Sequence, residues 1–330
     1  MQENYAPWDL DTRSLHAPAD LLRLAVLAPS SHNSQPWKFT VLGNTIRLSL
    51  DPSRCLKASD TNDRQAIISL GCAAENIAIG AEYYGYDVHI TSFGADGFSG
   101  VQIILTPGQQ PKDDPHHLIH FIPERTTNRR PYESRIPDAD ILDMLHAHAG
   151  PDLFIDIITD TGHIGLLGDI AVTAGIDAME DRGFRYELSH YLRSNTTQNP
   201  VGMPGVGFGF PAAIAYIAPL LVRFANMSKL SAQKDRALFT HTPAVVVIST
   251  THDTQADWFA TGRAYERAAL IATKAGMSTA PWGAPIQIGE HYRRIQETLS
   301  ITSRPQFLCR LGYPTSPTPH TPRLAISDVQ

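Results

Sequence analysis

The sequence predicts a protein of mixed helices and strands in which one structural unit is present twice. Helical and strand-like segments follow one another along the 330 residues, and two long helical segments carry the same pattern of small residues. Each residue of the second pattern lies 191 positions after its counterpart in the first, and the pairs are Gly71 and Gly262, Ala73 and Ala264, Glu75 and Glu266, Ala78 and Ala269, Ala81 and Ala272, and Gly85 and Gly276. Small residues at this spacing let two helix backbones approach closely. A duplication would make the chain a pseudo-dimer, one chain that does what two identical subunits do elsewhere; chance agreement between two alanine-rich helices is the alternative.

The first half of the chain predicts a helix, a strand hairpin, a long helix and two more strands. In chain order these segments are 19–28, 37–43, 45–51, 64–84, 88–93 and 101–106. The two hairpin strands flank Gly43-Asn44, a frequent turn dipeptide, and Gly85 is a typical C-terminal cap for the long helix.

The second half predicts a similar mixture with a long helical insertion. The segments are a short helix at 116–122, a helix at 138–147, a strand at 153–159, mainly helix over 160–240, a strand at 244–250, a helix at 257–275 and a strand at 306–314. The helix starts ADLL (19–22) and ADIL (139–142) form a second, weaker pair of copies. We therefore expect insertions to separate the two units.

Composition excludes several classes of function. Hydrophobic residues make up 42% of the chain and charged residues 18%, so a sizeable core can form. A formal charge of −6 gives no electrostatic reason to expect nucleic acid as a partner. The N-terminal segment has no basic region followed by an apolar one, so no signal peptide is predicted and a cytoplasmic location is expected.

Neither the cysteines nor the clustered histidines predict a metal site. The three cysteines, Cys55, Cys72 and Cys309, are far apart in sequence and form no CxxC pair, which argues against both zinc and a disulfide framework. The histidines at 116, 117 and 120 lie on one predicted short helix, but no further ligand set accompanies them. No P-loop and no GxSxG motif is present either.

One uncharged stretch, residues 205–222, is long enough to span a bilayer. Three glycines and two prolines interrupt it, however, and alternating glycine is poor material for a helix. We expect a mobile apolar lid or an interface segment over residues 196–226, without stable membrane insertion. A membrane-associated helical protein is the alternative.

Four segments carry groups suited to binding a ligand. APSSHNSQPWKF (28–39) gathers small hydrogen-bonding side chains between two prolines, and RTTNRR (125–130) combines guanidinium forks with hydroxyls that suit a phosphate. PWGAP (281–285) leaves backbone N–H groups open to a flat ligand, and HTPRL (320–324) places an arginine at the end of a proline-rich arm. Taken singly, each of the last three could be an ordinary solvated loop or arm.

Together, these segments resemble the FMN-dependent nitroreductase family. APSSHNSQPW resembles the family signature APSSxNxQPW, and RTTNR resembles its RxSxR motif. AGMSTAPWGA (275–284) resembles its LGLxxxPxxG segment, and HTPRL resembles its C-terminal PxR. The order of the motifs fits the two-repeat, single-chain Acg-like branch. The resemblance implies an α+β, three-layer sandwich with mainly antiparallel sheets, duplicated as a pseudo-dimer with repeats at 1–124 and 125–330, the second holding the lid insertion.

The resemblance also implies a site for FMN at the interface between the repeats. The residues carried over from the family motifs are Ser30, Ser31, Asn33, Arg125, Thr127, Arg129, Pro281, Gly283, Ala284 and Arg323. The arginines and Thr127 would hold the phosphate and ribityl groups, the segment at 30–33 would reach in from the first repeat, and the backbone around Gly283 would face the flavin ring near N5.

The implied reaction is ping-pong hydride transfer. NAD(P)H would reduce the flavin, and a small electron acceptor such as a nitro compound or a quinone would reoxidise it. No side-chain acid or base is required, so no catalytic residue is predicted. Each repeat lacks the motif that the other keeps, which predicts one site per chain and a monomer or weak oligomer. A low-turnover protein that sequesters FMN beneath a closed lid is the alternative.

Overall fold

The computed structural model describes residues 3–15, 18–94, 98–108 and 117–330. Its first sheet is antiparallel throughout, with strand order β1-β2-β4-β3. The strands are β1 (Trp37–Leu42), β2 (Thr45–Leu50), β3 (Tyr86–Phe93) and β4 (Gly100–Pro107). Gly43 has a φ of 58° between β1 and β2, which is the left-handed conformation that a tight hairpin requires. The predicted hairpin is therefore confirmed.

The second sheet repeats this antiparallel arrangement with order β5-β8-β10-β9. Its strands are β5 (Leu153–Ile158), β8 (Ala244–Thr250), β9 (Ser278–Pro281) and β10 (Arg304–Gly312). Every residue of β8 is buried, because helices cover both faces of this sheet. In β1, by contrast, buried and exposed residues alternate at first, as expected for a sheet with one solvent-facing side. The strand β9 occupies the connector before PWGAP (281–285), where no strand was predicted, and it shares only Pro281 with that segment.

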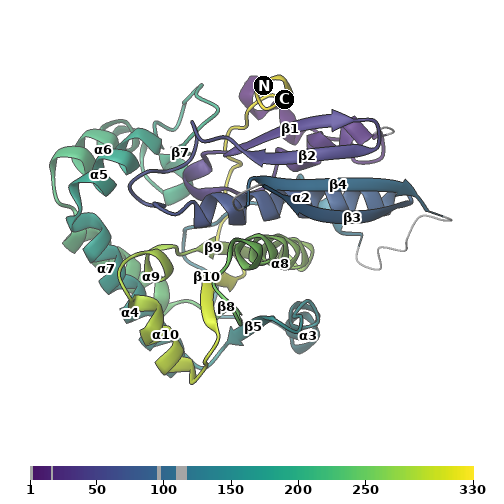
Figure 1. The fold of residues 1–330 in the computed structure, drawn as a ribbon. Coiled ribbons are helices and arrows are strands. Elements are labelled where there is room, and N and C mark those ends of the chain that lie inside the picture. The colour runs from purple at the N-terminus through teal and green to yellow at the C-terminus, as the bar shows by residue number, and fades with distance from the viewer. Residues whose placement is uncertain (1–2, 16–17, 95–97, 109–116) are drawn as a thin grey trace.

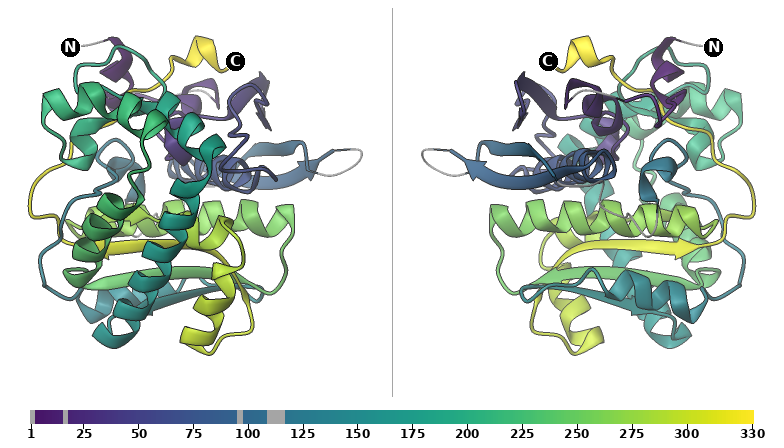
Figure 2. Two further views of the ribbon diagram at one scale, coloured as in Figure 1. Left: turned by 90° about the vertical axis from the view of Figure 1, so that its left-hand side faces the viewer. Right: turned by 90° about the vertical axis from the view of Figure 1, so that its right-hand side faces the viewer.

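The two long helices lie against each other between the sheets (Figures 1 and 2). They are α2 (Arg64–Tyr83) and α8 (Gln255–Lys274), and they cross at Gly71 and Gly262. A Cβ on Gly262 would lie 1.9 Å from the carbonyl oxygen of Ile68, and a Cβ on Gly71 would lie 2.2 Å from that of Phe259. The glycines paired by the sequence repeat are thus the contact point of the two helices, and the predicted α+β fold with internal duplication is confirmed.

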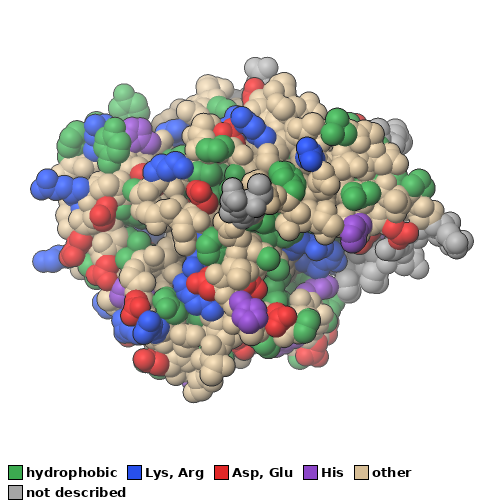
Figure 3. Space-filling view, in the orientation of Figure 1, with side chains coloured by type: hydrophobic (Ala, Val, Ile, Leu, Met, Phe, Trp, Pro, Cys, Tyr) green, Lys and Arg blue, Asp and Glu red, His purple; other side chains and the backbone are tan. Residues whose placement is uncertain are grey.

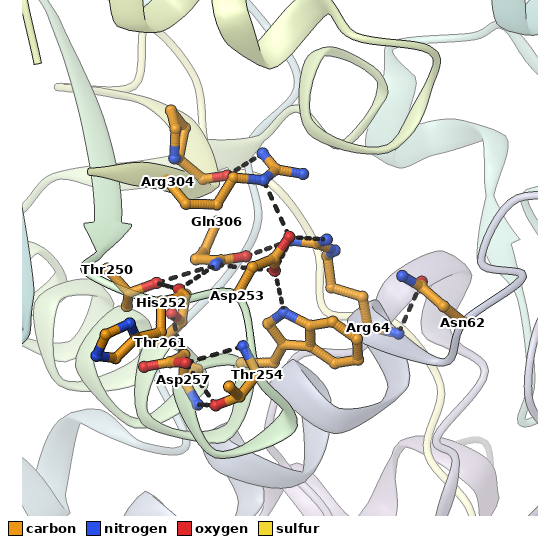
Figure 4. A network of polar contacts seen from close by, with 12 residues as sticks. Asn62, Arg64, Thr250, His252, Asp253, Thr254, Asp257, Thr261, Arg304 and Gln306 are labelled. Carbon is orange, nitrogen blue, oxygen red and sulfur yellow. Dashed lines mark hydrogen bonds and ion pairs between the residues drawn. The ribbon is translucent and has the colours of Figure 1, made fainter. Parts of the chain in front are cut away.

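A polar network joins the start of α2 to the start of α8 and to β10 (Figure 4). At its centre the carboxylate of Asp253 accepts hydrogen bonds from Arg64 at 3.0 Å, Arg304 at 3.1 Å and the Trp258 indole at 2.7 Å. Gln306 also donates to this carboxylate, at 3.1 Å. The two halves of the chain are therefore held together by ion pairs as well as by their shared apolar core.

Further helices cover the outer face of the second sheet (Figure 2, left). They are α4 (Thr161–Glu180), α9 (Ala284–Gln287) and α10 (His291–Leu299), and α7 (Ser228–Thr240) packs against α4. Shorter elements are the 3-10 helices at Glu3–Trp8, Pro18–Leu21, Ser31–Asn33, Leu118–Phe121 and Ile326–Asp328, with helices α1 (Leu22–Ala25) and α3 (Ala139–His146). The predicted helix at 19–28 is therefore only partly α-helical.

The remaining insertion forms what we call the lid lobe, residues 182–230. It contains α5 (Arg182–Tyr191), a short parallel pair of strands β6 (Leu192–Arg193) and β7 (Met203–Pro204), a 3-10 helix η5 (Gly205–Phe208), and α6 (Ala212–Phe224). The expectation that 205–222 is poor helix material was wrong for its second part, because the glycines end at Gly209 and an alanine-rich helix follows. None of the helices in the described ranges is long and apolar enough to cross a membrane.

The C-terminal tail leaves the second half and returns to the first, so that the two ends of the chain lie close together (Figure 1). The backbone N–H of Arg323 donates to the carbonyl of Asn4 at 2.8 Å, and that of Phe39 donates to the carbonyl of Val329 at 2.6 Å. The proline-rich arm predicted from the sequence therefore carries Arg323 to the first half.

Candidate functional site

Two adjoining cavities lie where the two halves meet the lid lobe. The larger has a volume of about 310 Å³ and the smaller of about 40 Å³. They share five lining residues, which are Pro29, Ser30, Thr127, Arg129 and Met203. All ten residues carried over from the family motifs line one cavity or both. Segments nearly 300 residues apart in the sequence thus form one two-compartment site.

The turn at residues 30–35 has a strained backbone that tertiary contacts stabilise. His32, Asn33 and Gln35 have φ values of 53°, 55° and 53°, which residues other than glycine seldom adopt. The Ser30 hydroxyl accepts the N–H of Gln35 at 3.0 Å, and the Gln35 side chain in turn accepts the backbone N–H of Leu324 at 2.9 Å. The crowded polar residues of this segment therefore hold the turn against the tail.

The amide of Asn33 is fully used by the protein. Its Nδ2 donates to the carbonyls of Gly202 at 3.1 Å and Pro322 at 2.9 Å, and its Oδ1 accepts from Arg323 at 2.5 Å. Asn33 therefore joins the turn, the lid lobe and the tail at the edge of the smaller cavity. Ser30 and Ser31, in contrast, line the larger cavity directly.

Three guanidinium groups surround the smaller cavity. Arg125 and Arg323 are 3% and 2% exposed. Nε and Nη1 of Arg125 and Nε of Arg323 are buried without a hydrogen-bond partner. Arg129 makes no hydrogen bond or ion pair with any described residue, and its guanidinium lies 4.9 Å from the centre of the Phe208 ring. Burial lowers the pKa of Arg129 and of Arg323.

The carboxyl group of Glu266 on α8 lies beside two of these cations, Arg125 and Arg323. Its Oε1 lies 3.5 Å from Nε of Arg125, within ion-pair distance but without a hydrogen bond. Burial raises the pKa of Glu266 to about 7 although Arg125 opposes the shift. The smaller cavity therefore carries an excess of buried positive charge with unused donors, which is unfavourable unless an anion binds there.

The larger cavity has apolar walls with a few polar groups. The floor comes from α2, through Ile68 and Cys72, and aromatic side chains of Tyr265 and Phe307 lie beside it. The loop after β9 forms one wall with Pro281, Trp282, Gly283 and Ala284. Among the described residues, the N–H groups of Gly283 and Ala284 donate to no protein acceptor. The cavity therefore offers a mainly apolar space with open backbone donors on one wall.

The lid lobe closes over this space. Phe184 and Leu188 of α5 line the larger cavity. The carboxylate of Glu187, between them, accepts the backbone N–H groups of Ala58 and Ser59, each at 2.9 Å, and the N–H of Lys57. The Ser59 hydroxyl also donates to it at 2.5 Å. Four donors thus hold α5 to the loop before α2.

Contacts at the other end of the lid lobe keep η5 in place. Arg130 donates to the carbonyl of Val206 at 2.8 Å, and Lys234 donates to that of Phe208 at 3.0 Å.

The centre of the His32 ring lies 5.6 Å from that of the Tyr191 ring, and burial lowers the pKa of His32 to about 4. The imidazole beneath the lid lobe is therefore neutral near pH 7.

Several lining residues were missed by the sequence reasoning. Lys234 and Asp235 reach the larger cavity from α7, and burial raises the pKa of Asp235 to about 6. No motif marks them, because their position depends on how α7 packs on α4. Glu266, which lies beside Arg125, was marked in the sequence only as the repeat partner of Glu75 and not as a residue of the site.

No cluster that could hold a metal ion occurs in the described ranges. His117 and His120 lie there, whereas His116 falls outside them.

No protein-family model matches the sequence. Among curated proteins, Rv3131 of Mycobacterium tuberculosis (strain ATCC 25618 / H37Rv), provisionally named an NAD(P)H nitroreductase, is 26% identical over 94% of this chain and 89% of its own. The similarly named acg of the same strain is 25% identical over 93% of both chains. PigM of Serratia sp. (strain ATCC 39006), also provisionally named an NAD(P)H nitroreductase, is 25% identical over 92% of this chain and 90% of its own.

Solved structures give a partial likeness. The FMN and NADPH-dependent nitroreductase NfnB from sphigopyxis sp. strain HMH is 15% identical, with a TM-score of 0.42, over 64% of this chain and 97% of its own. NfnB from Mycobacterium smegmatis, in complex with NADPH, is 13% identical, also with a TM-score of 0.42, over 66% of this chain and 98% of its own. The sequence likeness to these curated proteins therefore covers about nine-tenths of this chain and of each relative.

Proposed function

We propose that the protein is an FMN-dependent oxidoreductase that passes hydride from NAD(P)H to a small electron acceptor. The observation that carries this proposal is the two-compartment cavity, in which a pocket with excess buried positive charge adjoins a larger space with mainly apolar walls. A flavin mononucleotide has the matching shape and charge, with a phosphate at one end and a planar ring at the other. Relatives along nearly the whole chain carry names of NAD(P)H nitroreductases.

The smaller cavity would hold the phosphate. Arg129 can donate to it without losing a hydrogen bond or an ion pair, because its guanidinium makes neither with any described residue and contacts the face of Phe208. The free nitrogens of Arg125 and Arg323 supply further donors, and both side chains are already fixed by the carbonyl of Leu27, at 3.3 and 3.1 Å. Charged donors held in place before binding give strong, short hydrogen bonds to phosphate.

The remaining residues would position the ribityl chain and the ring. The hydroxyls of Ser30 and Thr127 stand at the junction of the two cavities, where a polyol would pass. The N–H groups of Gly283 and Ala284 would donate to the edge of the ring, while Pro281 and the α2 floor pack against it. When bound, the flavin would supply the hydride chemistry, and the chain would supply position and electrostatics.

We also propose that repeats 1–124 and 125–330 form one site per chain. The compartments use the turn at 30–33 from the first and the arginines from the second, so one chain is enough and no partner subunit is needed. The acceptor would be a nitro compound, a quinone or a similar small molecule. The alternative of a sequestering protein is not favoured, since the relatives bear reductase names.

The test is FMN binding followed by reduction. Purified protein should be yellow or take up added FMN, and anaerobic NADH or NADPH should bleach it. A colourless preparation that takes up no FMN would overturn the proposal, whereas slow bleaching over minutes would favour sequestration.

A single substitution tests whether Arg129 binds the phosphate. Arg129→Gln should weaken FMN binding by roughly 10- to 100-fold, the value of a hydrogen bond to a charged group. Because Arg129 makes no hydrogen bond or ion pair with any described residue, the variant should fold normally, and its circular dichroism spectrum checks this. The matched control is Arg236→Gln, whose side chain is 64% exposed on α7. Equal affinities of both variants would refute the assignment.

A further inference from the structure

Helix α6 presents an apolar surface to solvent. It buries only a narrow stripe, with Ala215 and Ala218 at its centre. Of the twelve large hydrophobic side chains that are exposed in the described structure, six belong to this one helix, and they are Ile214, Tyr216, Ile217, Leu220, Leu221 and Phe224. Tyr216 and Phe224 are 76% and 75% exposed. The exposed face of a helix on a soluble protein is ordinarily polar, so this surface indicates a binding partner.

The lid lobe that carries α6 is basic, although the chain as a whole is acidic. Residues 182–230 contain five arginines and lysines and one acidic residue, Glu187, for a net charge of +4 against −6 for the chain. The carboxylate of Glu187 is already bound by the loop at 57–59. Figure 3 shows apolar side chains gathered at the end of the molecule that α5 and α6 form, with basic side chains among them.

One of these cations lies within the apolar surface and has no acidic partner. The Arg223 guanidinium is 4.7 Å from the centre of the Tyr186 ring and 5.2 Å from that of Phe224. It makes no hydrogen bond or ion pair with any residue that the structure describes. Aromatic rings around an unpaired arginine are typical of segments that lie at a membrane surface.

A hollow beside the surface would accept an anionic group. It has a volume of about 360 Å³ and lies between α5 and α6. His190, Arg193 and Arg223 line it together with Pro219 and Leu220, and no acidic side chain does. A hollow lined by both arginines and apolar side chains matches the phosphate and upper acyl chains of a lipid.

We propose that the lid lobe docks on a bilayer that contains anionic lipid. The apolar face of α6 would lie in the interface, with Arg193 and Arg223 against lipid phosphates. The helix has no charge from Ala212 to Val222, and its 13 residues span about 20 Å, which suits a helix lying along the interface rather than across the membrane. A two-fold dimer through the same face would bring two lobes of net positive charge together, which is unfavourable.

Docking would place the bilayer next to the wall of the candidate site. Helix α6 packs closely on η5, where a Cβ on Gly205 would lie 2.4 Å from the Cβ of Ala215. Val206 and Gly207 of η5 line the smaller cavity, and Phe208 lines the larger. The proposal does not depend on flavin binding, because the proposed docking surface is the exposed face of α6, and η5 separates this face from the two cavities.

The test is co-sedimentation of the full chain with phosphatidylcholine vesicles that contain or lack phosphatidylglycerol. Binding should require phosphatidylglycerol and should weaken as salt is added. Arg223→Gln should reduce binding about five-fold, the effect of one cation near an anionic surface. The double variant Ile217→Ser, Phe224→Ser should reduce it further, and neither change should alter the circular dichroism spectrum.

Matched control variants distinguish binding through this surface from nonspecific binding to vesicles. Leu42→Ser removes an apolar side chain that is 60% exposed on β1, and Arg13→Gln removes a cation whose side chain is 78% exposed outside the lobe. Both should bind vesicles like the wild type. Failure of the wild type to bind at low salt, or equal losses in variants and controls, would overturn the proposal. So would a lipid-free dimer that the α6 variants dissociate, since the face would then be a subunit interface.

Discussion

The crossing of α2 and α8 gives the sharpest prediction from this structure. In Gly262→Ala the new Cβ would lie 1.9 Å from the carbonyl oxygen of Ile68 and 3.0 Å from the Cα of Gly71. The first distance is far below any real contact, and the obstacle is the backbone of a 20-residue helix, which cannot rotate away. The two helices must therefore separate by about 1 Å or more, which loosens contacts along both.

The expected cost is at the upper end of the range for overpacking, about 3 kcal/mol. Alanine is a better helix former than glycine by about 1 kcal/mol, so the net loss should be about 2 kcal/mol. Gly71→Ala should behave alike, because its Cβ would lie 2.2 Å from the carbonyl of Phe259. The helices also carry Cys72 and Tyr265 of the candidate site, so ligand binding should weaken as well.

The assay is urea unfolding followed by circular dichroism. The matched control is Gly165→Ala on the exposed side of α4, where an added Cβ meets nothing within 4 Å. That variant should be stabilised by about 1 kcal/mol. If Gly262→Ala were as stable as Gly165→Ala, the two helices would not be in the close contact described here, and the pseudo-dimer interface would need another explanation.

Two further predictions concern the lid lobe and the polar network. Glu187→Gln should speed amide hydrogen exchange in α5 roughly ten-fold or more, because charged hydrogen bonds to the loop at 57–59 are lost. Ser59→Ala removes one of the four donors and should have a smaller effect. Unchanged exchange in Glu187→Gln would show that these hydrogen bonds do not hold the lid lobe in place. Burial opposes ionisation of Asp253, but hydrogen bonds from Trp258 and Arg64 outweigh it and lower its pKa from 3.8 to about 2. Its carboxylate therefore contributes stability that is present above pH 3.8 and is lost as the pH falls toward 2. Asp253→Asn should flatten this part of the profile of urea midpoint against pH, and a profile that keeps the wild-type slope would argue against the assignment.

Local pattern was sufficient wherever neighbouring residues decide the structure. Gly43-Asn44 between two alternating runs predicted the first hairpin, because its turn depends on backbone conformation within four residues. The repeated glycines predicted the helix crossing, because only residues without a side chain allow such an approach. The motif residues also gathered in one place, as the resemblance implied, but their roles as ligands stay predictions.

Local pattern failed where packing decides the outcome. The glycine run at 205–209 predicted a poor helix, yet α6 forms directly after it because Ala215 and Ala218 pack on η5 and α5. Asn33 lines the smaller cavity, and its role as a ligand stays a prediction, but the sequence did not indicate that its amide donates to backbone carbonyls of the lid lobe and the tail. Neither partner is visible near residue 33 in the sequence.

The sequence by itself determined most of the strands, the two long helices and their repeated glycines, which follow from short-range periodicity, from turn chemistry and from the size of side chains. The family resemblance supplied ten of the residues that line the cavities. Only the tertiary structure decided that three guanidinium groups meet at the smaller cavity with Glu266 beside two of them, that Glu187 anchors the lid lobe, and that α6 exposes its apolar side. Burial, charge balance and exposure are properties of the assembled chain, because each depends on which distant segments exclude water from a given side chain.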